Sequence, residues 1–117
     1  MTRMTLYAAI VMAGTAFLPQ LAAAAGMLTD DKGMTLYIFD NDKDGMSACY
    51  GDCAKNWPPY LATADEKMGE GWTSVDRTDG TKQWAYDAKP VYFFAGDKAK
   101  GDATGDGKGG VWHVIVE

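Results

Sequence analysis

The chain has 117 residues, a formal net charge of -5 and a hydrophobic fraction of 47%. This length is enough for one domain. Nucleic acids and anionic membrane surfaces both carry negative charge, so the acidic balance argues against either as a partner.

Residues 1–25 have the pattern of a secretory signal peptide. Arg3 supplies a basic start, residues 6–18 are almost wholly apolar, and small residues precede Gly26. The apolar run is too short to span about 30 Å of hydrocarbon, so we do not expect a membrane anchor. No cysteine lies near the cleavage region, which excludes a lipid anchor there. We therefore expect cleavage near Ala25 and one periplasmic or secreted domain over residues 26–117, without a transmembrane segment.

The remaining chain predicts mainly β structure. In chain order, we expect strands at 34–39, 72–75, 82–86, 91–94 and 111–116, with a turn at 87–90 that makes 82–94 a hairpin. Short helices are expected at 47–57, ended by Pro58, and after a capping box at 63–66. Residues 96–110 are rich in glycine and aspartate and predict a loop. The four tryptophans are expected mostly in the core.

The chain repeats itself, without a gap, when it is shifted by the 55 positions that separate Tyr37 from Tyr92. The other matched pairs are Phe39 with Phe94, Asp42 with Asp97, and Trp57 with Trp112. Aromatic residues are rare, and a unit of this size cannot bury its own apolar face, so we expect two related halves that pack together. The fold class predicted is a small single domain of two related antiparallel β repeats with one or two short helices.

The repeated aspartates, Asp42 and Asp97, each follow a predicted strand. A carboxylate at that place accepts backbone N–H groups and fixes a turn, which is the interpretation we favour. The alternative is a paired carboxylate site between the halves.

The cysteines, Cys49 and Cys53, are four residues apart. In an exported protein such a pair favours a disulfide, and helical spacing places the Cα atoms about 6 Å apart, within disulfide range. The alternative is a copper-handling or thiol redox module with His113, because soft thiolates and imidazole suit copper. The sequence lacks the βαβ alternation of the copper chaperones that use this spacing.

Two acidic stretches resemble the first half of a calcium loop. The candidate calcium ligands are Asp40, Asp42, Asp44, Asp102 and Asp106, while His113 is a candidate metal ligand for copper only. The twelfth position needs a bidentate glutamate, but Gly51 and His113 stand there. We therefore favour acidic turns, and calcium-stabilised envelope binding is the alternative.

Several runs together resemble the bacterial secreted-repeat, or lipoprotein-repeat, family, which carries a Tyr-x-(Phe/Trp/Tyr)-x-x-Asp motif. The runs are 28–30, 35–42, 47–59, 79–86, 90–97 and 110–114. The resemblance implies an exported protein with repeats at about 28–59 and 79–114, no established activity, and a loose association with alkane catabolism. Many members carry a lipobox cysteine that this chain lacks, so lipid anchoring does not carry over.

No arrangement of nucleophile and base, phosphate loop or haem motif is found in the sequence. We therefore expect a non-catalytic binding or structural module without a cofactor, calcium or copper being the alternatives. Its partner is expected to be an envelope component or a small apolar ligand.

Overall fold

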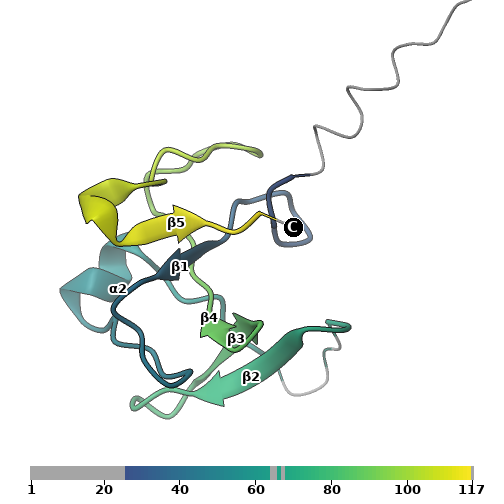
Figure 1. Ribbon diagram of the computed structural model, residues 1–117, viewed down its shortest axis with the longest axis vertical. Helices are drawn as coiled ribbons and strands as arrows, with labels where there is room; N and C mark the ends of the chain where they lie inside the picture. The colour runs from purple at the N-terminus through teal and green to yellow at the C-terminus, as the bar shows by residue number, and fades with distance from the viewer. Residues whose placement is uncertain (1–25, 64–65, 67, 117) are drawn as a thin grey trace, which may run out of the picture.

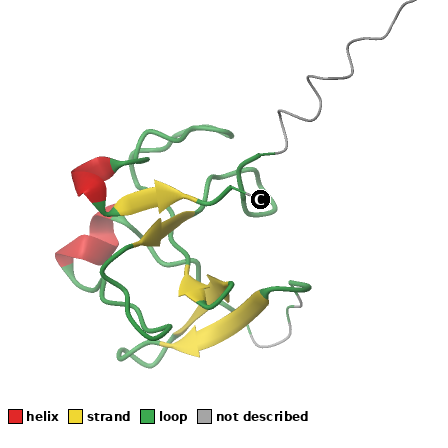
Figure 2. Ribbon diagram, in the orientation of Figure 1, coloured by secondary structure: helices red, strands yellow, loops and turns green. Residues whose placement is uncertain are grey.

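The structure is a computed structural model that describes residues 26–63, 66 and 68–116. Its strands are β1 (Tyr37–Phe39), β2 (Trp72–Asp76), β3 (Lys82–Tyr86), β4 (Lys89–Pro90) and β5 (Trp112–Val114). The helices are α2 (Asp52–Asn56) and the 3₁₀ helix η1 (Lys108–Gly110). Loops connect these short elements over most of the described chain (Figure 2). The prediction of a small, mainly β domain with antiparallel sheets is confirmed.

Two small sheets form the domain (Figure 1). Strands β1 and β5 pair antiparallel, with Tyr37 opposite Val114, and β2, β3 and β4 form an antiparallel meander. The two repeats meet at Tyr37 and Tyr92, whose backbones exchange two hydrogen bonds of 2.8 and 2.9 Å. The repeated tyrosines therefore mark the point where the two halves of the chain cross.

A hairpin forms at 82–90, with β3 and β4 joined at Asp87 and Ala88. Both residues have positive φ angles, 50° and 68°, as a two-residue type I′ turn requires. The strand predicted at 91–94 was wrong, because the second strand lies at Lys89–Pro90, inside the predicted turn. The chain beyond Pro90 leaves the sheet, and Tyr92 pairs with Tyr37 and Pro59 instead.

Strand β3 has the predicted bounds and β2 is one residue longer, whereas the first and last strands and the helix are shorter than predicted. Residues 34–39 and 111–116 contain only the three-residue strands β1 and β5, because the repeats cross and pairing lasts only a few residues. The predicted start of the helix at residue 47 is wrong, because the helix begins at Asp52 and ends at Asn56. Before it, the side chains of Asp42 and Ser47 accept the N–H groups of Ala48 and Cys49, which holds the backbone outside a helix.

At the predicted capping box, the Thr63 hydroxyl donates to Glu66 at 3.0 Å, but neither residue lies in a helix. Residues 64, 65 and 67 of that predicted helix lie outside the described residues. The predicted loop at 96–110 contains only the short 3₁₀ helix η1.

The core has two parts because side chains alternate along each crossing strand. Tyr37 and Phe39 face the first part, whereas Leu36 and Ile38 face the second. We call the first part the aromatic core; it contains Tyr37, Phe39, Cys49, Cys53, Trp57, Tyr92, Phe94, Val111, Trp112 and Val114. The second part gathers Leu28, Leu36, Trp84 and Val91 with partly buried neighbours.

A column of four rings runs through the aromatic core. The central pair, Trp57 and Trp112, stacks with centroids 3.9 Å apart and ring planes 2° apart. Phe94 stacks on Trp57 at 4.4 Å, and Phe39 stacks on Trp112 at 4.1 Å. Each phenylalanine thus lies on the tryptophan of the other repeat, so the matched residues of the sequence pack as a symmetric set.

Gly105 gives a first testable prediction. A Cβ at this position would lie 2.6 Å from a ring carbon of Trp57 and 3.0 Å from two ring carbons of Phe94. We expect Gly105→Ala to lower the free energy of unfolding by about 1–3 kcal/mol, because overpacking forces the stacked rings apart. Ala99→Ser, an exposed change in the same loop, is the control. Equal urea denaturation curves for both variants would contradict the ring packing.

Candidate functional site

The motif tyrosines and aspartates bind across the repeats. The Tyr37 hydroxyl donates to Asp97 Oδ2 at 2.7 Å, and the Tyr92 hydroxyl donates to Asp42 Oδ2 at 2.7 Å. Each tyrosine of one repeat therefore binds the aspartate of the other. We call these four residues the tyrosine–aspartate clasp.

The second carboxylate oxygen of each clasp aspartate holds its own loop. Asp42 Oδ1 accepts the N–H of Ala48 at 2.7 Å. Asp97 Oδ1 accepts the N–H and the hydroxyl of Thr104 at 2.9 and 2.6 Å. Each aspartate thus joins a local turn to the opposite repeat, and each carboxylate is paired with a phenol.

Burial sets the protonation state of the clasp. It raises the pKa of both Tyr37 and Tyr92 well above the usual value, and the neighbouring carboxylates add to this effect. Burial also raises the pKa of Asp42, while hydrogen bonds from Tyr92 and Ala48 oppose the increase. The phenols therefore stay protonated and act as donors to the carboxylates at neutral pH.

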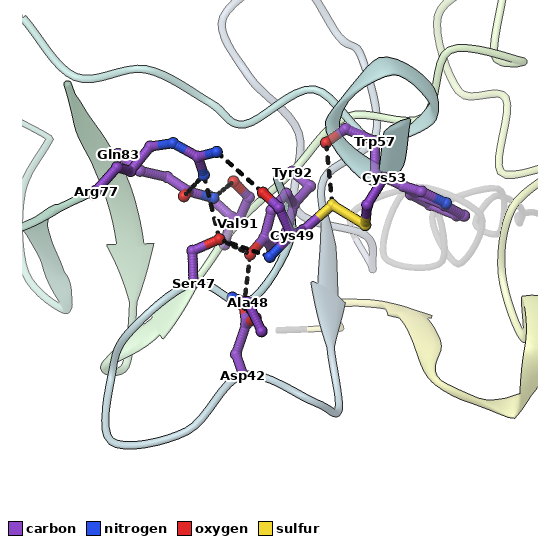
Figure 3. The surroundings of a disulfide bond; sticks show 10 residues. All are labelled: Asp42, Ser47, Ala48, Cys49, Cys53, Trp57, Arg77, Gln83, Val91 and Tyr92. Carbon is purple, nitrogen blue, oxygen red and sulfur yellow. Dashed lines mark hydrogen bonds between the residues drawn. A yellow bond between two sulfur atoms is a disulfide. The ribbon is translucent and has the colours of Figure 1, made fainter. Parts of the chain in front are cut away.

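A buried arginine extends the clasp on the side of the first repeat (Figure 3). Arg77 Nη1 donates to Ser47 Oγ at 3.1 Å and to Gln83 Oε1 at 2.7 Å, and Nη2 donates to the Cys49 carbonyl at 2.9 Å. The Arg77 side chain is only 2% exposed, and its Nε lies 3.6 Å from Asp79. This guanidinium therefore ties the second repeat to the loop that carries the first cysteine.

The hydrogen bonds that join Arg77, Ser47, Tyr92 and Asp42 all run in one direction from donor to acceptor. Ser47 Oγ accepts from Arg77 and from the Cys49 N–H, so its own proton is free to donate to Tyr92 Oη, 2.6 Å away. Tyr92 in turn donates to Asp42. A chain of donors thus runs from a buried cation to a partly buried carboxylate.

Sequence reasoning missed Arg77, Ser47 and Gln83. The sequence contains one signal for Arg77. It is the single arginine after residue 25, where the other basic side chains are lysines and His113. A planar guanidinium can donate to several acceptors at once, which an ammonium does less well in a buried site.

Cys49 and Cys53 form a disulfide, with Cα atoms 5.2 Å apart. It links the loop held by Arg77 to the first turn of α2 (Figure 3). Both sulfurs are in this bond, so neither is a thiolate ligand in this structure. His113, the third candidate for copper, instead binds Asp40, with Nε2 2.8 Å from Oδ2.

The candidate calcium ligands are held by separate partners. Asp40 binds His113 and Asp42 belongs to the clasp. Asp102 accepts the N–H groups of Lys98 and Ala99, and Asp106 accepts that of Val114. Over the described ranges, no group of three or more His, Cys, Asp or Glu side chains is arranged to hold a metal ion. Asp40, Asp42 and Asp44 line one cavity, but they are not brought together as a ligand set.

Comparison with family models gives one match for each half of the chain. Residues 22–60 and residues 73–116 both match a family described as a secreted repeat of unknown function. The chain belongs to this secreted-repeat family. Comparisons with curated proteins and with solved structures find no match.

Each matched repeat of the secreted-repeat family contains one tyrosine and one aspartate of the clasp. The first matched repeat contains Tyr37 and Asp42, and the second contains Tyr92 and Asp97. The family implies an exported protein. Within the residues that the structure describes, no helix is long and apolar enough to cross a membrane.

The clasp can be tested with single-atom changes. We expect Tyr37→Phe and Tyr92→Phe each to lower the free energy of unfolding by about 1–3 kcal/mol, because the aspartate oxygen of the other repeat loses its donor. Tyr86→Phe is the matched control, since its hydroxyl makes no hydrogen bond to the described part of the chain. Urea denaturation measures all three, and losses no larger than that of the control would contradict the clasp.

The raised tyrosine pKa values predict alkaline instability. The phenol pKa is near 10.0 in the unfolded chain and higher in the folded protein. The folded state then retains a proton that the unfolded state releases, so this stabilisation is complete below pH 10 and is lost as pH rises above it.

We expect the free energy of unfolding to fall more steeply from pH 10 to about pH 11 in the wild type than in Tyr92→Phe. Urea denaturation at a series of pH values measures the slope. Parallel pH profiles for the two proteins would be inconsistent with a buried phenol at residue 92.

Proposed function

We propose that residues 26–117 form an exported, non-catalytic binding or structural module of the periplasm or cell exterior. The observation that carries this proposal is the clasp. The motif residues that recur in both halves, Tyr37, Asp42, Tyr92 and Asp97, bind one another inside the molecule.

Catalytic groups usually combine a perturbed pKa with access to a cleft. The tyrosines with strongly raised pKa values here, Tyr37 and Tyr92, are completely buried, and their hydroxyls are occupied by hydrogen bonds. A substrate cannot reach them without unfolding the crossing point of the repeats. This burial supports a structural role for the motif and leaves the loops as the surface for contact with partners.

Export is supported by the family and by the disulfide. Disulfides persist in oxidising compartments, which include the bacterial periplasm and the cell exterior. The Cys49–Cys53 bond closes a short loop, so we expect it to fix the segment between Ser47 and α2 rather than to dominate global stability.

Expression of the full chain in a bacterial host tests the export part of the proposal. We expect the protein in the periplasmic fraction or the medium, with an intact mass that begins at residue 26 and lacks two hydrogens for the disulfide. Val11→Asp, which breaks the apolar run, is the control and should keep the full-length mass in the cytoplasm. A wild-type protein that keeps its leader and two free thiols would contradict the proposal.

The non-catalytic part is tested by covalent probes on the purified protein. A fluorophosphonate, which labels activated serines, and iodoacetamide, which labels thiolates, should both leave the native protein unmodified. Stoichiometric labelling at one residue would reveal an activated nucleophile and overturn this part of the proposal.

A further inference from the structure

The disulfide is exposed on one side only. Cys49 is completely buried in the aromatic core, whereas Cys53, in the first turn of α2, is partly exposed. A thiolate in solution therefore reaches the sulfur of Cys53 before that of Cys49. Thiol–disulfide exchange depends on such access and on which sulfur is attacked, and attack on Cys53 makes Cys49 the leaving group.

The backbone of Cys49 connects the disulfide to one half of the clasp (Figure 3). Its N–H donates to Ser47 Oγ at 3.2 Å, and its carbonyl accepts from Arg77 at 2.9 Å. Ser47 Oγ also lies 2.6 Å from the Tyr92 hydroxyl, which donates to Asp42. A displacement of Cys49 is therefore transmitted to the Tyr92–Asp42 hydrogen bond through one side chain, that of Ser47.

The second repeat holds its matching loop without a covalent bond. The shift of 55 positions that superimposes Tyr37 on Tyr92 also matches Cys49 with Thr104, and Cys53 with the first residue of η1. Thr104 donates its N–H and its hydroxyl to the clasp aspartate of its own repeat, at 2.9 and 2.6 Å. Hydrogen bonds thus hold the loop before η1, whereas a disulfide holds the loop before α2. A reductant therefore acts on the first repeat alone.

The rest of the fold does not depend on the disulfide. The two cysteines are four positions apart, and a bond that closes so short a loop removes little entropy from the unfolded chain. The column of stacked rings, the backbone pairing of Tyr37 with Tyr92 and the Tyr37–Asp97 hydrogen bond are all made by other residues. We therefore expect the reduced protein to stay folded.

We propose that the Cys49–Cys53 bond is a reducible site that releases the loop between β1 and α2, and that its reactant is a dithiol. One thiolate of the dithiol attacks Cys53 Sγ, the S–S bond breaks, and Cys49 leaves as a thiolate that takes up a proton. The second thiol then displaces Cys53 from the mixed disulfide, so both cysteines become thiols and the dithiol becomes a disulfide. Reduction loosens the half of the clasp made by Tyr92 and leaves the half made by Tyr37 in place.

Exchange of the clasp hydroxyl protons tests the effect of reduction. NMR spectra of the purified protein are compared before and after treatment with excess dithiothreitol in the absence of denaturant, and mass spectrometry verifies the gain of two hydrogens. We expect the Tyr92 hydroxyl proton to exchange about tenfold faster after reduction, because the loop beside it opens locally. The Tyr37 hydroxyl proton is the internal control and should change by less than about twofold.

Two substitutions test the path from the disulfide to the clasp. Ser47→Ala removes the side chain between Cys49 and Tyr92, so Tyr92 exchange should be fast in the oxidised protein and change by less than about twofold on reduction. Thr104→Val removes the matching tie of the second repeat and is the control. It should accelerate exchange at Tyr37 and leave the response of Tyr92 to reduction unchanged.

Single-cysteine variants test the site of attack. Cys49→Ser leaves the thiol of Cys53, and Cys53→Ser leaves the thiol of Cys49, so both variants lack the same covalent tie. We expect iodoacetamide to label Cys53 about tenfold faster than Cys49, because reactivity follows exposure of the thiolate.

The source of the dithiol is distinguished by its size. Reduced thioredoxin, a protein dithiol, replaces dithiothreitol in a second series at equal concentration. Faster reduction by thioredoxin would support the proposal with another exported protein as the reductant. Faster reduction by dithiothreitol would support it with a small dithiol.

Four results would overturn the proposal. These are a disulfide that resists both dithiols until urea is added, loss of the native spectrum on reduction, equal exchange responses of the two tyrosines, and faster labelling of Cys49 than of Cys53. The second result would make the bond a requirement of the whole fold. The reducible site goes beyond the proposed function, and its tests use purified protein, so their failure is distinguishable from failure of export or from labelling of an activated nucleophile in the oxidised protein.

Discussion

The hydrogen bond from a tyrosine of one repeat to an aspartate of the other is the interaction on which the rest of this structure depends. It is made twice, at 2.7 Å each time, by the two tyrosines whose backbones pair with each other. Because each aspartate also holds its own loop, one side chain connects local turn geometry to the packing of the two halves. Neither repeat can satisfy its motif alone, which explains why the two form one domain.

The motif residues therefore form the interface between the two repeats. The tyrosine supplies the crossing point and the donor, the phenylalanine two residues later supplies a ring for the column, and the aspartate supplies the acceptor. The tryptophan fifteen residues after each aspartate completes the set, as Trp57 and Trp112 stack at the centre. Outside this symmetric core the repeats differ: the first has the disulfide, and the second has Arg77 and a glycine-rich loop.

Much of this organisation could be predicted from the sequence. The duplication is visible in the matched aromatic residues, which are rare, and side chains alternate between the two faces of the predicted strands. The offset between Tyr37 and Tyr92 identifies the two halves, and the spacing of Cys49 and Cys53 indicates the disulfide. The partner of each aspartate could not be predicted, because a turn residue and a cross-repeat acceptor have the same local pattern. Arg77 was missed for a similar reason, since its buried acceptors come from distant segments.

Both phenols are fixed hydrogen-bond donors at the point where the repeats cross. The most direct measurement is NMR detection of the hydroxyl protons of Tyr37 and Tyr92 in the native protein. We expect two slowly exchanging hydroxyl resonances, each removed by the corresponding tyrosine-to-phenylalanine change. Hydroxyl protons at residues 37 and 92 that exchange with water as fast as that of Tyr86 would contradict it.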